Sequence, residues 1–266
     1  MRRLLLLGAS AALAAACARP LREPPSVAVL ASKPPAPMEA GEASLLDAGE
    51  ARWGRRPDVA SVREAESLFL QAARADDADV RGLIGAVRAK AWLVDHVPDP
   101  AAREADAVSA VQAAQWCGRR RPDVAACDFW LAIAVGLQAR EVRQTAEWGL
   151  KTMVDALERA IAREPGYERG GPHRVLALLL LRAPGWPLGP GDADAGLEHA
   201  RAAVALAPEY APNVLALAEA YADLREREPA REAYAKARVL AEAARAAGDP
   251  DAPEWLAEAE RGASAK

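Results

Sequence analysis

Long apolar runs and β-strand patterns are missing from most of this 266-residue sequence. β-branched residues are sparse, and no stretch alternates apolar and polar residues with period two, so a sheet is not expected. Alanine, leucine, arginine and glutamate dominate instead, and all four favour helices. After the first 16 residues, no segment is apolar and long enough to cross a bilayer. The sequence therefore predicts an all-α protein without a later transmembrane helix.

The side chains that carry most enzyme chemistry are also scarce. The chain has three histidines, His96, His173 and His199, and none has a His or Cys partner at metal-ligand spacing. No Ser-His-Asp or Cys-His grouping suggests nucleophilic catalysis. The net charge of −4 gives no electrostatic footprint for nucleic acid. We expect neither an enzyme nor a nucleic-acid-binding protein, and we expect no metal or cofactor.

The N-terminus has the features of an export signal. Two arginines precede an apolar stretch that ends in small residues before Cys17. The run from Leu13 to Cys17 resembles a bacterial lipobox, although Leu13 stands four places before the cysteine and not three. Cleavage after the small residues 14–16, without lipidation, is the alternative. The sequence predicts a signal peptide at 1–16, a lipid on Cys17 that attaches the protein to a membrane, and a place on the periplasmic side of the envelope. Ala18 favours the outer membrane.

The segment after this cysteine is rich in proline. Residues 18–41 contain six prolines, which fix the backbone and remove hydrogen-bond donors. Such a run stays extended and solvated. We therefore predict a lipidated cysteine with a tether at 17–43 and a helical domain at 44–266.

Two further cysteines are Cys117 and Cys127. One closes a predicted helix and the other opens the next, across a short turn. Antiparallel helices joined in this way can bring their ends within disulfide reach, and an exported protein meets oxidising conditions. The sequence predicts a disulfide between them, with two buried free thiols as the alternative.

The helical part contains an internal repeat. Each unit has a small residue, a bulky one four later, Ala three after that, and often Pro five further on, where the helix must end. This spacing resembles the second helix of the tetratricopeptide repeat, and a first helix precedes each match. The resemblance implies a right-handed α-solenoid of about five helix hairpins, with a C-terminal capping helix at residues 253–262. The five matches start at Ala65, Ala110, Met153, Gly196 and Ala230.

A more specific resemblance lies between Asp128 and Tyr221. Gly170-Gly171-Pro172-His173-Arg174, the loop Ala183-Pro184-Gly185-Trp186-Pro187 and Ala207-Pro208 resemble the T component of TRAP (tripartite ATP-independent periplasmic) transporter systems. That family consists of periplasmic tetratricopeptide lipoproteins. The resemblance implies a solute-binding protein or other envelope protein as partner and a hydrophobic small molecule as ligand.

Tetratricopeptide solenoids bind with the concave groove formed by their first helices. The groove positions of two first helices predict a mostly apolar ligand-binding site at Trp130, Ile133, Leu137, Arg174, Leu178 and Leu181. An apolar groove suits a hydrophobic ligand or an amphipathic partner helix. The alternative is that these side chains belong to the core, covered by a neighbouring helix or by the loop at 183–191.

Two functions follow from these patterns. The first is a transport-associated binding lipoprotein whose groove or pore takes an apolar solute. The second is a protein-interaction scaffold in envelope assembly that uses the same groove for a polypeptide. A cavity enclosed by the helices and the loop would favour the first, and an open trough would favour the second. The sequence leaves open whether the chain forms a homo-oligomer.

Overall fold

The computed structural model describes residues 21–35, 37–142 and 146–264, with the side chains of residues 146 and 147 excepted. The predicted signal peptide and Cys17 therefore lie outside the described residues. All regular elements in the described ranges are helices, apart from one isolated β-bridge. They are α1 (Val27–Leu30), α2 (Leu45–Trp53), α3 (Val59–Ala75), α4 (Arg81–His96), α5 (Pro100–Arg120), α6 (Ala125–Glu141), α7 (Ala146–Arg163), α8 (Tyr167–Arg182), α9 (Ala193–Leu206), α10 (Ala211–Asp223), α11 (Arg227–Ala246) and α12 (Ala252–Ser264).

Local signals in the sequence fix where several helices begin. Asp58 and Asp99 accept hydrogen bonds from the first backbone N–H groups of α3 and α5, and Pro100 starts α5 where no donor is needed. Asp192 caps α9 through a 3.0 Å bond from the backbone N–H of Ala195, as its position after the loop predicts. These caps satisfy donors that the helices cannot pair internally.

The helices form an α-solenoid of five hairpins, as the repeat predicts. Helices α2, α4, α6, α8 and α10 are the first helices, each pairs with the helix that follows it, and α12 packs on α11 as a cap. The small repeat positions lie at the hairpin contacts, where an alanine lets two helices approach closely. Ala65, Ala110, Ala160, Ala203 and Ala237 are all fully buried.

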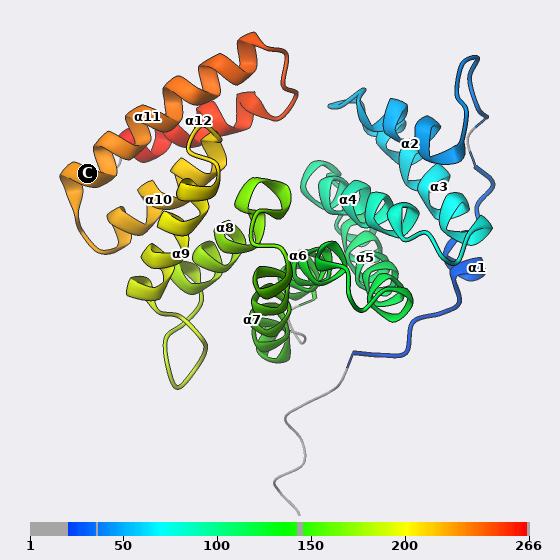
Figure 1. Cartoon of the computed structure of the whole chain (residues 1–266), viewed down its shortest axis with the longest axis horizontal. Helices are drawn as coiled ribbons and strands as arrows, with labels where there is room; N and C mark the ends of the chain where they lie inside the picture. The colour runs from blue at the N-terminus through cyan, green and yellow to red at the C-terminus, as the bar shows by residue number, and fades with distance from the viewer. Residues whose placement is uncertain (1–20, 36, 143–145, 265–266) are drawn as a thin grey trace, which may run out of the picture.

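The solenoid is strongly curved. Each first helix contacts the next one along the chain, and α10 contacts α12, whereas the backbones of the second helices stay apart within the described part of the chain and long side chains such as Arg63 bridge the space between them. Close inner helices and separated outer helices bend the stack into an arc (Figure 1). The first helices and α12 therefore form the inner wall, which is the concave surface of the molecule.

Residues 21–31, the first described part of the proline-rich segment, pack on the helices and so differ from a solvated tether, whereas residues 32–35 and 37–41 are exposed. The indole N–H of Trp116 donates to the Pro25 carbonyl oxygen at 2.7 Å, and the Gln71 amide donates to that of Ala31 at 2.8 Å. Val27 and Ala31 are buried against α3 and α5. Side-chain N–H groups on the helices donate hydrogen bonds to the backbone carbonyl oxygens of this segment, in place of the bonds that a neighbouring strand would make. The segment from Leu21 therefore packs on the outside of the solenoid.

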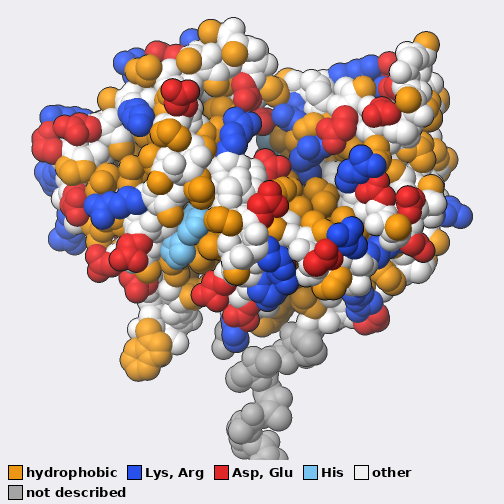
Figure 2. Space-filling view, in the orientation of Figure 1, with side chains coloured by type: hydrophobic (Ala, Val, Ile, Leu, Met, Phe, Trp, Pro, Cys, Tyr) orange, Lys and Arg blue, Asp and Glu red, His pale blue; other side chains and the backbone are white. Residues whose placement is uncertain are grey.

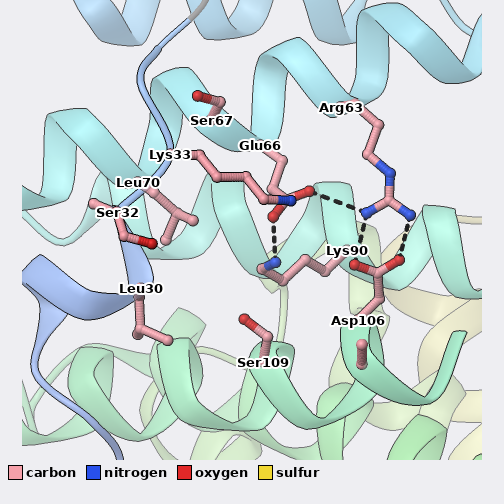
Figure 3. Close-up of a pocket in the computed structure, with 12 residues that line it drawn as sticks. Leu30, Ser32, Lys33, Arg63, Glu66, Ser67, Leu70, Lys90, Asp106 and Ser109 are labelled. Carbon is pink, nitrogen blue, oxygen red and sulfur yellow. Dashed lines mark hydrogen bonds and ion pairs between the residues drawn. The ribbon is translucent and has the colours of Figure 1, made fainter. Parts of the chain in front are cut away.

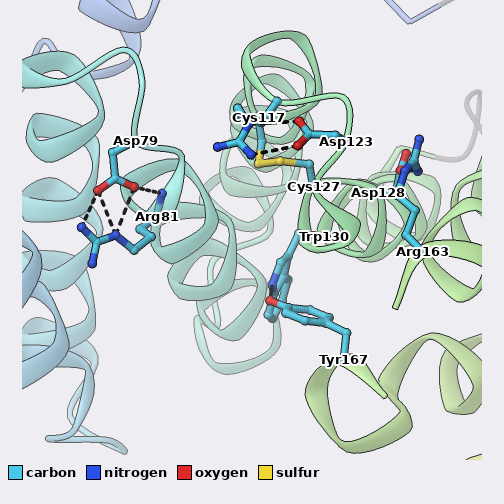
Figure 4. The surroundings of a disulfide bond; sticks show 10 residues. Asp79, Arg81, Cys117, Asp123, Cys127, Asp128, Trp130, Arg163 and Tyr167 are labelled. Carbon is cyan, nitrogen blue, oxygen red and sulfur yellow. Dashed lines mark hydrogen bonds and ion pairs between the residues drawn. A yellow bond between two sulfur atoms is a disulfide. The ribbon is translucent and has the colours of Figure 1, made fainter. Parts of the chain in front are cut away.

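The structure places Cys117, at the end of α5, in a disulfide with Cys127 in the first turn of α6 (Figure 4). Their Cα atoms are 5.3 Å apart, within the range that an unstrained bridge needs. Both cysteines are buried in the core that joins the second and third hairpins.

Candidate interaction surface

Aromatic side chains are concentrated on the inner wall. Six of them come from the first helices, from α12 or from the turn that leads into a first helix, and each is half-buried. We call them the inner-wall aromatics. They are Trp53, Trp92, Trp130, Tyr167, Tyr210 and Trp255.

Arginines stack on two of these rings, Trp53 and Tyr210. The Arg88 guanidinium lies 4.7 Å from the centre of the Trp53 ring and bonds to Glu50 at 2.5 Å. Burial raises the pKa of Tyr167 to about 12, and the charge of Arg88 opposes that shift. Arg88 belongs to α4 and Tyr167 to α8, so this charge acts between two first helices that are not neighbours in the stack.

The first residues of α8, which we call the α7–α8 turn, have an unusual backbone that is not helical. Glu168, Arg169 and Gly170 follow one another with φ of 48°, 57° and 81°. Two adjacent non-glycine residues in the left-handed region are strained and persist only when their surroundings hold them. The turn lies in the middle of the arc in Figure 1, and exposed Arg169 stacks on Tyr210 at 4.1 Å.

A buried polar network holds this turn. Asn213 is fully buried in α10, and its amide nitrogen donates to the carbonyl oxygens of Arg169 at 2.9 Å and Ala203 at 2.8 Å. Its amide oxygen accepts a 2.9 Å bond from Arg174, whose pKa burial lowers. One asparagine therefore ties α8, α9 and α10 together and fixes the turn on the inner wall.

The two ends of the arc meet. Arg56, in the α2–α3 turn, makes a two-pronged ion pair with Asp251, just before α12, at 3.3 and 3.2 Å. The Arg56 side chain is only 9% exposed and lies 3.7 Å from the centre of the Trp53 ring. We call this contact, with the next one described, the clasp. The space-filling view shows the surface hollowed beside the junction (Figure 2).

His96 makes the second contact of the clasp. Its ring stacks on Trp92 with centroids 3.7 Å apart, its Nδ1 lies 2.7 Å from the Trp92 carbonyl oxygen, and its Nε2 lies 2.8 Å from a Glu254 carboxylate oxygen. Both partners are hydrogen-bond acceptors, so a ring nitrogen that carries a proton donates to the oxygen beside it.

The structure places the six predicted groove residues in several different surroundings. Trp130 and Ile133 pack against buried core residues, and the Trp130 indole N–H bonds to the Tyr167 hydroxyl at 3.0 Å. Leu181 packs against Gly196 of α9, within its own hairpin. Arg174 belongs to the buried network described above.

The remaining two predicted groove residues are Leu137 and Leu178. Both are half-buried and lie on the first helices α6 and α8. Trp130, Ile133 and Leu181 are likewise half-buried. The loop at 183–191 does not cover the inner wall, because it projects outward below α8 and α9 (Figure 1).

Sequence reasoning missed several residues that the fold brings together. The clasp joins residues 195 and 158 positions apart in the sequence, and no local pattern marks them. His173 and His199 lie with their Nδ1 atoms 2.9 Å apart, although they are 26 positions apart in the sequence. Burial lowers the pKa of both imidazoles, and for His173 the neighbouring His199 lowers it further.

A polar cavity of about 280 Å³ lies on the outer side, between the N-terminal segment and helices α3, α4 and α5 (Figure 3). Arg63 bonds to Asp106 at 2.6 Å through both terminal nitrogens, and buried Lys90 pairs with Glu66. Burial would raise the pKa of Glu66, but Lys90 and Arg63 outweigh that effect and lower it. Two cations and two carboxylates compensate one another here, so the network ties three helices together.

Among the described residues no group of three or more His, Cys, Asp or Glu side chains could hold a metal ion. The same part of the chain contains no helix long and apolar enough to cross a membrane.

No protein-family model and no curated protein matches the sequence. A solved structure, a thermophilic tetratricopeptide-repeat protein of Thermus thermophilus, is similar in fold. It superposes with a TM-score of 0.60 at 20% sequence identity, and the match covers 82% of this chain and 97% of that one. The fold of this chain is tetratricopeptide-like. At a sequence identity this low, the match shows a similar fold and nothing more specific. The resemblance to the transporter T component receives no support from it.

Proposed function

We propose that this chain is a protein-interaction scaffold whose inner wall holds a polypeptide segment of a partner. The observation that carries the proposal is the set of inner-wall aromatics, with arginines stacked on two of them. Tryptophan, tyrosine and arginine dominate the binding energy of protein interfaces because they combine apolar area with hydrogen-bonding groups. Their concentration on the concave surface of a tetratricopeptide-like fold supports binding there.

The form of the site favours a polypeptide over a small apolar solute. The loop that could have closed the groove points away from it, and several residues of the predicted apolar stripe are half-buried against core side chains. What remains accessible combines half-buried rings with charged groups such as Arg169, Glu168 and Asp251. Such a surface suits a segment that carries its own polar backbone. The solute-binding function in a transporter has no comparable support.

We also propose that the protein is exported and anchored by a lipid on Cys17, at the periplasmic side of the envelope. The basic start, the apolar stretch and the small residues before the cysteine support this. The partner would then be another envelope protein. No catalytic role is proposed.

A peptide-display selection tests the binding function. The full chain would be used to select from random 12-residue peptides, and the affinity of selected peptides would be compared between variants. We expect Trp92→Ser and Arg169→Glu to weaken binding at least tenfold. The control Arg231→Glu, at an exposed site on outer helix α11, should bind as the wild type does. Unchanged affinity in both inner-wall variants, with helicity retained, would contradict the proposal.

A further inference from the structure

The loop between α8 and α9 carries the two most exposed large apolar side chains of the described structure. Trp186 is 90% exposed and Leu188 is 80% exposed. Residues 183–191 contain no charged side chain at all. Figure 2 shows the result as an isolated hydrophobic tip that stands away from the body at the lower left.

The base of this loop is built to hold its shape. The backbone N–H of Gly191 donates to the Pro184 carbonyl at 2.9 Å, and that of Asp192 donates to Leu180 at 2.9 Å. A β-bridge joins Gly185 to Gly191. A side chain at Gly191 would meet the Ala183 carbonyl oxygen at 2.2 Å, so only glycine permits the close approach. Ordered exposure of tryptophan and leucine in water is unfavourable, which indicates that a partner covers the tip.

The position of the chain start identifies the partner. Leu21 packs on the core beside α5, and Cys17 stands four residues before it. Four extended residues span about 14 Å, so a lipid on Cys17 must enter a membrane close to Leu21. In Figure 1 the blue start of the described chain and the loop at 183–191 lie along the same lower edge of the molecule. A membrane that holds the anchor would therefore face the tip.

We propose that Trp186 and Leu188 insert into the lipid headgroup region of the membrane that carries the anchor. This inference rests on the proposed lipidation of Cys17. Tryptophan favours the membrane interface because its ring is apolar and its N–H is polar. The absence of charge from residues 183–191 removes the main cost of leaving water. A lipid on Cys17 attaches one point of the protein to the membrane, and a second apolar contact on the same edge strengthens the attachment and fixes how the solenoid is oriented above it.

The test uses the full chain from the membrane fraction, reconstituted in phosphatidylethanolamine–phosphatidylglycerol vesicles whose acyl chains carry bromine. Bromine quenches tryptophan emission only at short range. We expect quenching in the wild type, and loss of the quenched fraction in Trp186→Ser. The matched control is Val239→Ser, which removes another exposed apolar side chain on α11, and it should be quenched as the wild type is. Far-ultraviolet circular dichroism would check that each variant is folded.

The anchor is assayed separately, by incorporation of labelled fatty acid into wild type and Cys17→Ser. Loss of label in Cys17→Ser, together with quenching that depends on Trp186, supports the inference. Label without Trp186-dependent quenching in vesicle-bound protein overturns the membrane contact but leaves the anchor, and would assign the tip to a protein partner. Absence of label overturns the anchor, and the proposed orientation with it, without affecting the peptide-binding test.

Discussion

Replacing Asn213 by alanine should strongly destabilise the C-terminal half of the solenoid. The fully buried amide donates to two backbone carbonyl oxygens at 2.9 and 2.8 Å and accepts a bond from Arg174. Three lost hydrogen bonds at about 1 kcal/mol each would be joined by about 1–3 kcal/mol for leaving the Arg174 guanidinium without this partner. We expect the free energy of unfolding to fall by roughly 4–6 kcal/mol.

Thermal unfolding followed by circular dichroism measures this change. For a chain of this size, such a loss lowers the melting temperature by about 8–24 °C. The double variant Asn213→Leu/Arg174→Leu removes the donor, the acceptor and the buried charge together, and it should recover part of the loss. A change below about 1 kcal/mol in Asn213→Ala, or a double variant less stable than the single one, would refute our account of the network.

Three further predictions concern cross-links and charge. Thiol titration of the unfolded, unreduced protein should find neither Cys117 nor Cys127 free, and two reactive thiols would exclude the bridge. A double-mutant cycle with Arg56→Ala and Asp251→Ala should give a coupling energy of about 0.5–1 kcal/mol that shrinks in high salt, whereas zero coupling at low salt would mean that the ends do not meet in solution. His173 and His199 have lowered pKa values in the folded state, so the stability they contribute is present above their unfolded pKa near 6.5 and is lost as pH falls through the folded pKa. The melting temperature should therefore drop on acidification below about pH 6.5, and less so in His173→Gln/His199→Gln; an equal drop in that variant would show that the pair does not contribute.

The hairpins could be predicted from the sequence because their signals are local. An alanine at a fixed spacing allows two adjacent helices to approach, and a proline or a capping aspartate ends or begins a helix within a few residues. Ala65, Ala110 and Asp192 lie where this reasoning places them. The fold class depends mainly on such short-range patterns, and it is confirmed.

The site could not be predicted in the same way, because it depends on how small rotations add up along five hairpins. Whether Trp130 faces a groove or a neighbour is decided by Tyr167 in the next hairpin, which the helical period of α6 cannot reveal. The clasp between Arg56 and Asp251 requires the curvature of the whole arc. The proline-rich segment packs because Trp116 and Gln71 offer donors to its carbonyls, and its composition alone gives no sign of this.

The central claim is that the inner wall binds a polypeptide, and photo-cross-linking tests it most directly. A display-selected peptide carrying a benzophenone group would be irradiated with the full chain, and the attachment sites would be mapped by mass spectrometry. Our account predicts cross-links on α4, α8, α10 and α12 and on the α7–α8 turn, near Trp92 and Arg169. Cross-links confined to the outer helices α3, α5, α7, α9 and α11 would contradict it.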